Sequence, residues 1–257
     1  MTRTPELWRP KFHQPLIAIG SILFLALLWQ LIAAHEASPL LPTPMKVLEV
    51  LWQESISGRL PHHLGMTLAR LIVSFLISMI LGTAMGIALG RTPRLDQFFS
   101  TWLVIALNIP ALVTIILCYV WFGLGEFAAI LAVVINKLPQ VIVTVREGAR
   151  HLRQDLLEMA EVYRFGTFNT LRHVLWPQLF PYIMTAGRTG LALIWKIILV
   201  VELLGRSNGM GYQLHLFFQT FDVASILAYS LAFIFIVQLM EWTILVPLDL
   251  KAQRWRR

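Results

Sequence analysis

The stretch DLLEMAEVYRFGTFNTLRHVLWPQLFP, residues 155–181, is charged and amphipathic, and it lies between two strongly apolar runs. The 257 residues of the chain are 57% hydrophobic and 14% charged, whereas about a quarter of the residues of an ordinary soluble domain are charged. This composition indicates a protein that crosses a membrane several times. Because residues 146–177 are too polar to cross a bilayer, they divide the apolar runs into two groups.

Six apolar runs are long enough to cross a bilayer, which takes roughly 20 predominantly apolar residues. We expect spans at residues 16–34, 67–90, 101–122, 126–145, 179–204 and 223–247. The first run is longer than a signal-peptide core and is followed by no clear cleavage site, so we expect it to be retained. The predicted fold is all-α, with a membrane domain over residues 16–247, an N-terminal tail at 1–15 and a basic tail at 248–257.

The basic residues predict the orientation of these spans. With both termini inside, fourteen of the 21 lysines and arginines fall in inner segments and four in outer ones. Positive charge concentrates on the cytoplasmic side of membrane proteins. Both termini and residues 146–177 are therefore expected in the cytoplasm of a bacterial cell, with residues 35–66 and 205–222 on the other side of its inner membrane.

Residues 146–177 read as two short helices with a kink near Gly166. Asp155 is expected to cap the first helix, with Glu158 at its third position, and Trp176-Pro177 to end the second. One interpretation is a pair of helices lying on the lipid surface. Acidic side chains are unfavourable beside an anionic leaflet, so a protein partner suits Asp155, Glu158 and Glu161 better.

Small and polar residues inside the spans suggest further roles. Gly82, Gly86 and Gly90 recur every four residues, which suits a close packing seam within the chain or between subunits, although glycine is also simply tolerated in membrane helices. Polar residues inside spans are functional candidates by default, and Asn136, Lys137, Arg188, Lys196 and Glu202 are such residues. Arg188 and Glu202 lie near the ends of the fifth span, so the alternative is that they reach the membrane surface or pair locally. Lys196 lies near mid-span, so it is expected to face a wet path or to pair with a carboxylate on another helix.

The sequence resembles the inner-membrane permeases of binding-protein-dependent ABC importers, in the nitrate, sulfonate and taurine class. Their cytoplasmic signature reads E-A-A, three residues, G, nine residues, I-x-L-P. Here Glu158-Met159-Ala160 stand at its start, Val174 stands at the aliphatic position, and Trp176-Pro177 stand in place of Leu-Pro. Arg164 stands where the family has glycine, so we expect the turn to move to Gly166. Residues 41–51, 109–126 and 187–214 extend the resemblance over most of the chain.

The resemblance implies the fold of a type I ABC importer permease, with a coupling helix that docks on a cytoplasmic ATPase. It implies two ATPase subunits that hold ATP and Mg²⁺, a second permease copy and an extracytoplasmic binding protein. We expect Gly166→Pro or charge reversal at Glu158 to uncouple transport. The coupling residues implied are Glu158, Met159, Ala160, Arg164, Gly166, Thr167, Phe168 and Pro177.

Other function classes find little support in the sequence. No G-x-x-x-x-G-K-[ST] loop is present, so we expect no bound nucleotide or other cofactor on this chain. His62 and His63 are adjacent and diverge by about 100° on a helix, so no metal site and no enzyme are predicted. The sequence has no run of basic residues with interleaved aromatics that would indicate nucleic-acid binding. A self-sufficient channel or secondary transporter is the alternative, and the solute stays open among nitrate, sulfonates, taurine, cyanate, pyrimidine precursors and aromatic carboxylates.

Overall fold

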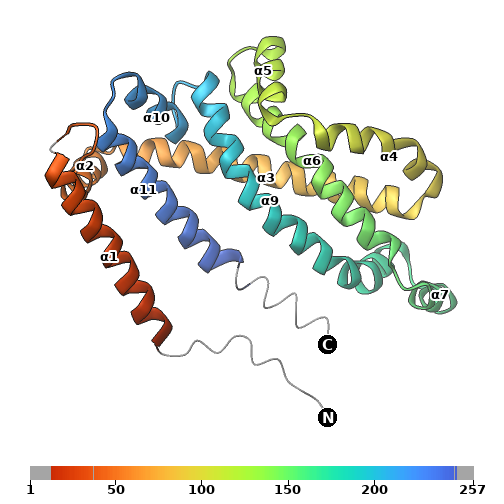
Figure 1. Cartoon of the computed structure of the whole chain (residues 1–257). Helices are drawn as coiled ribbons and strands as arrows, with labels where there is room; N and C mark the ends of the chain where they lie inside the picture. The colour runs from red at the N-terminus through yellow and green to blue at the C-terminus, as the bar shows by residue number, and fades with distance from the viewer. Residues whose placement is uncertain (1–12, 37, 246, 248–257) are drawn as a thin grey trace.

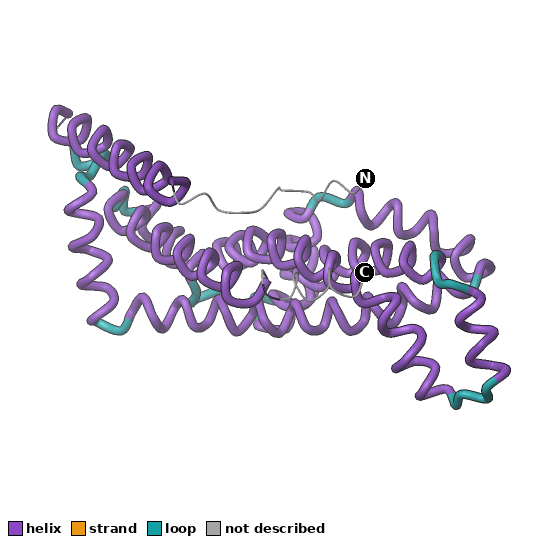
Figure 2. Tube along the Cα trace, turned by 90° about the horizontal axis from the view of Figure 1, so that it is seen from below, coloured by secondary structure: helices purple, strands orange, loops and turns teal. Residues whose placement is uncertain are grey.

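The computed structural model describes residues 13–36, 38–245 and 247, and within these residues it is helical, with short connections and no strand (Figure 2). The all-α fold predicted from composition is therefore confirmed. The elements are α1 (His13–Glu36), α2 (Pro44–Ile56), α3 (Arg59–Arg91), α4 (Pro93–Asn108), α5 (Ala111–Phe122), α6 (Glu126–Arg150), α7 (Gln154–Val162), α8 (Thr167–Thr170), the π-turn η1 (Leu171–Leu175), α9 (Trp176–Gly205), α10 (Met210–Gln219), α11 (Val223–Met240) and the π-turn η2 (Glu241–Leu245).

Helices α3, α6 and α9 form the centre of the molecule (Figure 1). Among the described residues, three helices are by themselves long and apolar enough to cross a membrane, over Arg59–Arg91, Glu126–Arg150 and Val223–Thr243. Helix α9 is 30 residues long and covers the expected span 179–204. Helix α1 contacts α2 and lies apart from the central helices (Figure 1). The count of six spans stays a prediction.

The apolar run at 101–122 is not one straight helix. It is divided between α4 and α5, whose axes differ by 96°. The break lies at Ile109 and Pro110, which both have extended backbone. Proline lacks the N–H that would continue the helical hydrogen bonds, and it disfavours helical geometry in the residue before it. The apolar run is thereby divided between two helices with different neighbours.

The three regularly spaced glycines of α3 lie against α6. A Cβ atom at Gly82 would stand 2.6 Å from the Cβ of Val141, one at Gly86 2.8 Å from that of Val145, and one at Gly90 2.5 Å from that of Ala149. Real Cβ atoms do not approach so closely, so these positions admit only glycine unless the helices separate. The seam therefore lies within the chain and brings the α3 and α6 backbones together.

Candidate functional site

The polar segment, residues 146–177, forms a protrusion at one end of the helices, with α7 beyond the ends of α6 and α9 (Figure 1). Ala160 is buried and anchors α7 to the rest of the molecule. In contrast, Val162, Tyr163 and Phe168 are 79%, 72% and 70% exposed, although they are large and apolar. These three residues form the tip of the segment, which thus presents apolar side chains to its surroundings beside charged residues.

The turn after α7 is at Arg164, so the expectation that it moves to Gly166 is wrong. Arg164 has φ +50°, whereas Gly166 has φ −64° and ψ 160°. The N–H of Phe165 donates to the Ala160 carbonyl at 2.8 Å, and the N–H of Arg164 donates to the Glu161 carbonyl at 2.9 Å. These two bonds are the Schellman motif that ends many helices, and it requires a left-handed residue at the position of Arg164.

We expect Arg164→Gly to stabilise the end of α7 by about 1 kcal/mol, because glycine adopts the left-handed conformation without the Cβ clash that an L residue meets. Hydrogen exchange of the backbone amides at positions 164 and 165 should be slower in the variant than in the parent protein. Gly166→Ala, at a position with ordinary extended geometry, serves as the control. Equal protection in both variants would contradict strain at Arg164.

Two other expectations about this segment need correction. Asp155 does not cap α7: Arg153 is the N-cap residue, and no side chain caps the helix. Asp155 lies inside the first turn, where a hydrogen bond from the Arg153 side chain lowers the pKa of its carboxyl. Pro177 does not end the second helix, because α9 begins at Trp176 and proline is tolerated in a first helical turn.

The expected coupling residues divide between two surfaces. A groove of about 560 Å³ separates the C-terminal end of α3 from α7, α8 and η1, and Glu158, Ala160 and Thr167 line it. Met159 and Phe168 are also exposed but lie outside the lining of this groove. Gly166 has open space around its Cα and a φ that proline also adopts. Gly166→Pro is consequently a poor means of disrupting this segment, contrary to our expectation from the sequence.

A buried ion pair joins α3 to α9 at the opposite end of the molecule. Arg70 is 4% exposed and Glu202 is fully buried, and Nη1 of Arg70 lies 2.7 Å from Oε1 of Glu202. Thr67 donates to the other Glu202 oxygen at 2.9 Å. Arg70 also contacts Glu126 of α6 at 2.6 Å, and Arg206 contacts the same carboxylate. Two cations and two anions therefore connect α3, α6 and α9 at the end of the molecule opposite the polar segment.

The same cluster fixes the loop between α9 and α10. The Asn208 carbonyl accepts a hydrogen bond from Arg70 at 3.0 Å. The N–H of Met210 donates to Thr67, and the N–H of Gly211 donates to Glu202. Glu202 therefore has a complete set of partners inside this chain, which favours a structural part for it over a place in a translocation path.

The remaining polar candidates lie on different faces. Lys196 is on the exposed face of α9, while Glu202 is on its buried face. Asn136 is half-buried and donates to the Ala132 carbonyl of its own helix at 2.8 Å. Lys137, beside it, is buried against Gly190 and donates to Gln140 at 2.7 Å. Among these groups only Lys196 faces outward, on the stripe that also carries Thr185 and Thr189.

The sequence pattern did not identify Arg70 or Glu126 as parts of a polar cluster. Arg70 lies near the start of the expected span 67–90, and α3, which begins at Arg59, places it inside the helix. Its partner Glu202 is 132 residues away, so spacing gave no signal for the pair. Within the described residues, no group of three or more histidine, cysteine, aspartate or glutamate side chains is placed to hold a metal ion.

Comparisons with known proteins agree with this architecture. The chain is 28% identical over 214 residues to the taurine transport system permease protein TauC of Escherichia coli (strain K12), covering 80% of this chain and 78% of that one. It is 29% identical over 189 residues to the putative aliphatic sulfonates transport permease protein SsuC of Bacillus subtilis (strain 168), with 73% and 68% covered. It is 26% identical over 215 residues to the nitrate import permease protein NrtB of Synechocystis, with 80% and 77% covered.

A solved structure shows the same fold. A chain of the MetNI methionine ABC transporter, in an inward-facing conformation, superposes with a TM-score of 0.61 over 74% of this chain and 93% of that one, at 18% sequence identity. Residues 78–243 match the family model described as "Binding-protein-dependent transport system inner membrane component". The resemblance noted in the sequence is confirmed, and the chain belongs to the family of inner membrane components of binding-protein-dependent transport systems.

Proposed function

We propose that this chain forms, as one of two permease copies, the translocation path of an ATP-driven importer for a small anionic solute. An extracytoplasmic binding protein delivers the solute, and two separate ATPase subunits hold ATP and Mg²⁺. The family membership supports the transport role. The relatives named for taurine, aliphatic sulfonates and nitrate favour an anion, and a sulfonate or nitrate is the class we put first.

The observation that carries the proposal is the exposed apolar tip of the polar segment. Val162, Tyr163 and Phe168 are exposed beside charged residues on a protrusion (Figure 1), and large exposed apolar side chains surrounded by polar ones mark protein interaction sites. We place the ATPase contact there. The N-terminal end of α1 and the C-terminal end of η2 both lie toward the end of the helices that carries the polar segment (Figure 1). This arrangement is in keeping with cytoplasmic termini.

Phe168→Ala is the test of this docking role. Interface aromatics that fill a partner's pocket cost about 2 kcal/mol or more when truncated, so we expect ATPase subunits to co-purify at least about tenfold less well. ATPase activity stimulated by the loaded binding protein should fall in parallel. Phe98→Ala, at an exposed aromatic of α4, is the matched control. Normal recovery and coupling in Phe168→Ala would refute the docking role, and uptake without any ATPase would favour a channel or secondary transporter.

Lys196 is the cation that we place beside the translocation path. It lies on the exposed face of α9, on the stripe that carries Thr189 about two turns away and Thr185 about three turns away, and its ammonium group can attract an anion. We expect Lys196→Gln to lower the rate of solute uptake about tenfold while two copies still co-purify, since a lysine in a membrane helix is retained only with a wet or charged neighbour. Loss of the paired assembly instead would assign Lys196 to an ion pair between subunits.

A further inference from the structure

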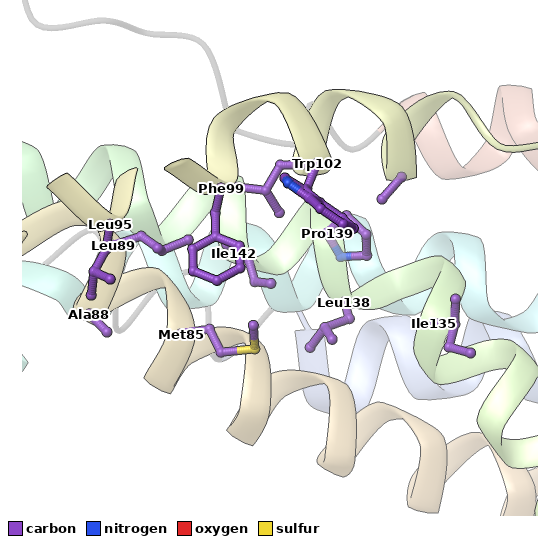
Figure 3. A pocket seen from close by; sticks show the side chains of 12 residues that line it. Met85, Ala88, Leu89, Leu95, Phe99, Trp102, Ile135, Leu138, Pro139 and Ile142 are labelled. Carbon is purple, nitrogen blue, oxygen red and sulfur yellow. The ribbon is translucent and has the colours of Figure 1, made fainter. Parts of the chain in front are cut away.

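An apolar groove of about 450 Å³ opens between α3, α4 and α6 (Figure 3). Phe99 and Trp102 project from α4, Met85 from α3, and Pro139 and Ile142 from α6 (Figure 3). Every side chain that lines it is apolar apart from the indole N–H of Trp102. The volume lies within the usual range of ligand pockets, roughly 300–1,000 Å³.

The groove is open on the outer surface of the helices, where a bilayer would surround them. Its walls α3 and α6 are both long enough to cross a bilayer. At its mouth Met85, Leu95, Trp102 and Ile135 are 44%, 43%, 66% and 42% exposed, so no described part of this chain covers it. It runs along α4 from Leu95 to Ala106, about 16 Å at the rise of an α-helix. An elongated apolar groove of this kind fits an extended hydrocarbon chain.

Positive charge stands at one end of the groove, where α3 turns into α4. Arg91 ends α3 and Arg94 lies in the first turn of α4, directly before the groove residue Leu95. Both arginines are exposed, and neither has an ion pair with a residue that the structure describes. The neighbouring carboxylate of Asp96 is already bound by Arg146 and Arg150. The turn therefore holds two exposed cations without an ion pair among the described residues, and the acidic side chains of Glu158 and Glu161 line the neighbouring groove together with Arg91.

We propose that this groove binds a phospholipid with an anionic headgroup. One acyl chain lies along α4 between Phe99 and Ile142, and the phosphate contacts the guanidinium groups of Arg91 and Arg94. Basic residues at the cytoplasmic ends of membrane helices attract anionic headgroups, and the apolar lining accepts the chain without an unsatisfied polar group. Arg91 also lines the groove beside α7, so the bound lipid adjoins the segment proposed to meet the ATPase.

Native mass spectrometry of the purified full-length chain, with the subunits that co-purify with it, tests the proposal. The probes are dioleoyl phosphatidylglycerol and dioleoyl phosphatidylcholine, which share acyl chains and differ in headgroup charge. We expect phosphatidylglycerol to be retained preferentially, and Arg91→Gln/Arg94→Gln to lower that preference by about tenfold or more. Arg172→Gln, at an exposed arginine away from the groove, should leave it unchanged, and free inorganic phosphate should not compete.

Two substitutions on α3 test the groove itself. Ala88→Trp places a large ring in the groove and should abolish retention of both lipids, whereas Ala84→Trp, exposed one turn away and outside the lining, should not. Unchanged headgroup preference in the double arginine variant, or unchanged retention in Ala88→Trp, overturns the proposal. So does a disulfide between two copies through Trp102→Cys in a Cys118→Ser background, because a second copy would then occupy the groove.

Discussion

Arg70→Met is expected to lower the free energy of unfolding by about 3–5 kcal/mol, the usual cost of leaving one member of a buried ion pair without its partner. Glu202 is fully buried and would keep only the hydrogen bonds from Thr67 and the Gly211 N–H. For a chain of this size that loss corresponds to a fall in Tm of at least about 6 °C. Thermal unfolding of the purified protein in detergent, followed by intrinsic fluorescence, measures it.

A second variant separates the charge effect from lost packing. Arg70→Met/Glu202→Leu removes both charges and leaves Arg206 to pair with Glu126, so we expect it to recover more than half of the lost stability. Lys46→Met removes a solvent-exposed pair with Glu49 and should cost about 1 kcal/mol or less. Equal losses in Lys46→Met and Arg70→Met would show that the buried cluster contributes no more than a surface pair.

Gly86→Leu is expected to cost about 3 kcal/mol or to prevent folding, because an added side chain would overpack the contact between two helix backbones. A Cβ atom there would lie 2.9 Å from the Ile142 carbonyl oxygen and 2.8 Å from the Cβ of Val145. Neither atom is at the end of a flexible side chain, so the helices must separate. The yield of monodisperse protein in size-exclusion chromatography and its Tm give the readout.

Gly65→Leu is the matched control on the same helix, since nothing lies within 4 Å of a Cβ atom at Gly65. We expect its Tm to stay within about 2 °C of the parent value, as is usual for surface substitutions worth about 0.5 kcal/mol or less. A comparable loss in Gly65→Leu would mean that leucine perturbs α3 through the backbone alone. The seam would then contribute nothing specific to the fold.

Features that depend on neighbours in the sequence were predictable. The apolar runs fall on helices in the structure, with the run at 101–122 divided between two of them, and the glycine spacing corresponds to one face of α3. The break between α4 and α5 has a local cause in Pro110, yet proline also occurs inside membrane helices. Composition alone therefore did not separate a bent crossing from a straight one.

Features that depend on distant residues were not predictable. The Arg70 and Glu202 pair is decided by how α3 packs on α9, and no spacing rule connects the two positions. The left-handed conformation of Arg164 was missed for a different reason. Residue preference favoured Gly166, but the carbonyls of Ala160 and Glu161 need the two closing hydrogen bonds at the end of α7. That requirement outweighs the strain of an arginine at the turn.

The polar segment and the fifth apolar run are one uninterrupted helical rod. From Thr167 through α8, η1 and α9 to Gly205 the backbone stays helical, with a π-turn at Leu171–Leu175. No non-helical residue separates Thr167 from the loop held by Glu202, so we expect a displacement at Thr167 to reach that loop through continuous helix, past Pro177 and Pro181. Deleting one residue of the π-turn would rotate the tip by about 100° about the rod axis. The π-turn therefore determines the direction in which the side chains near Thr167 point relative to those near Gly205.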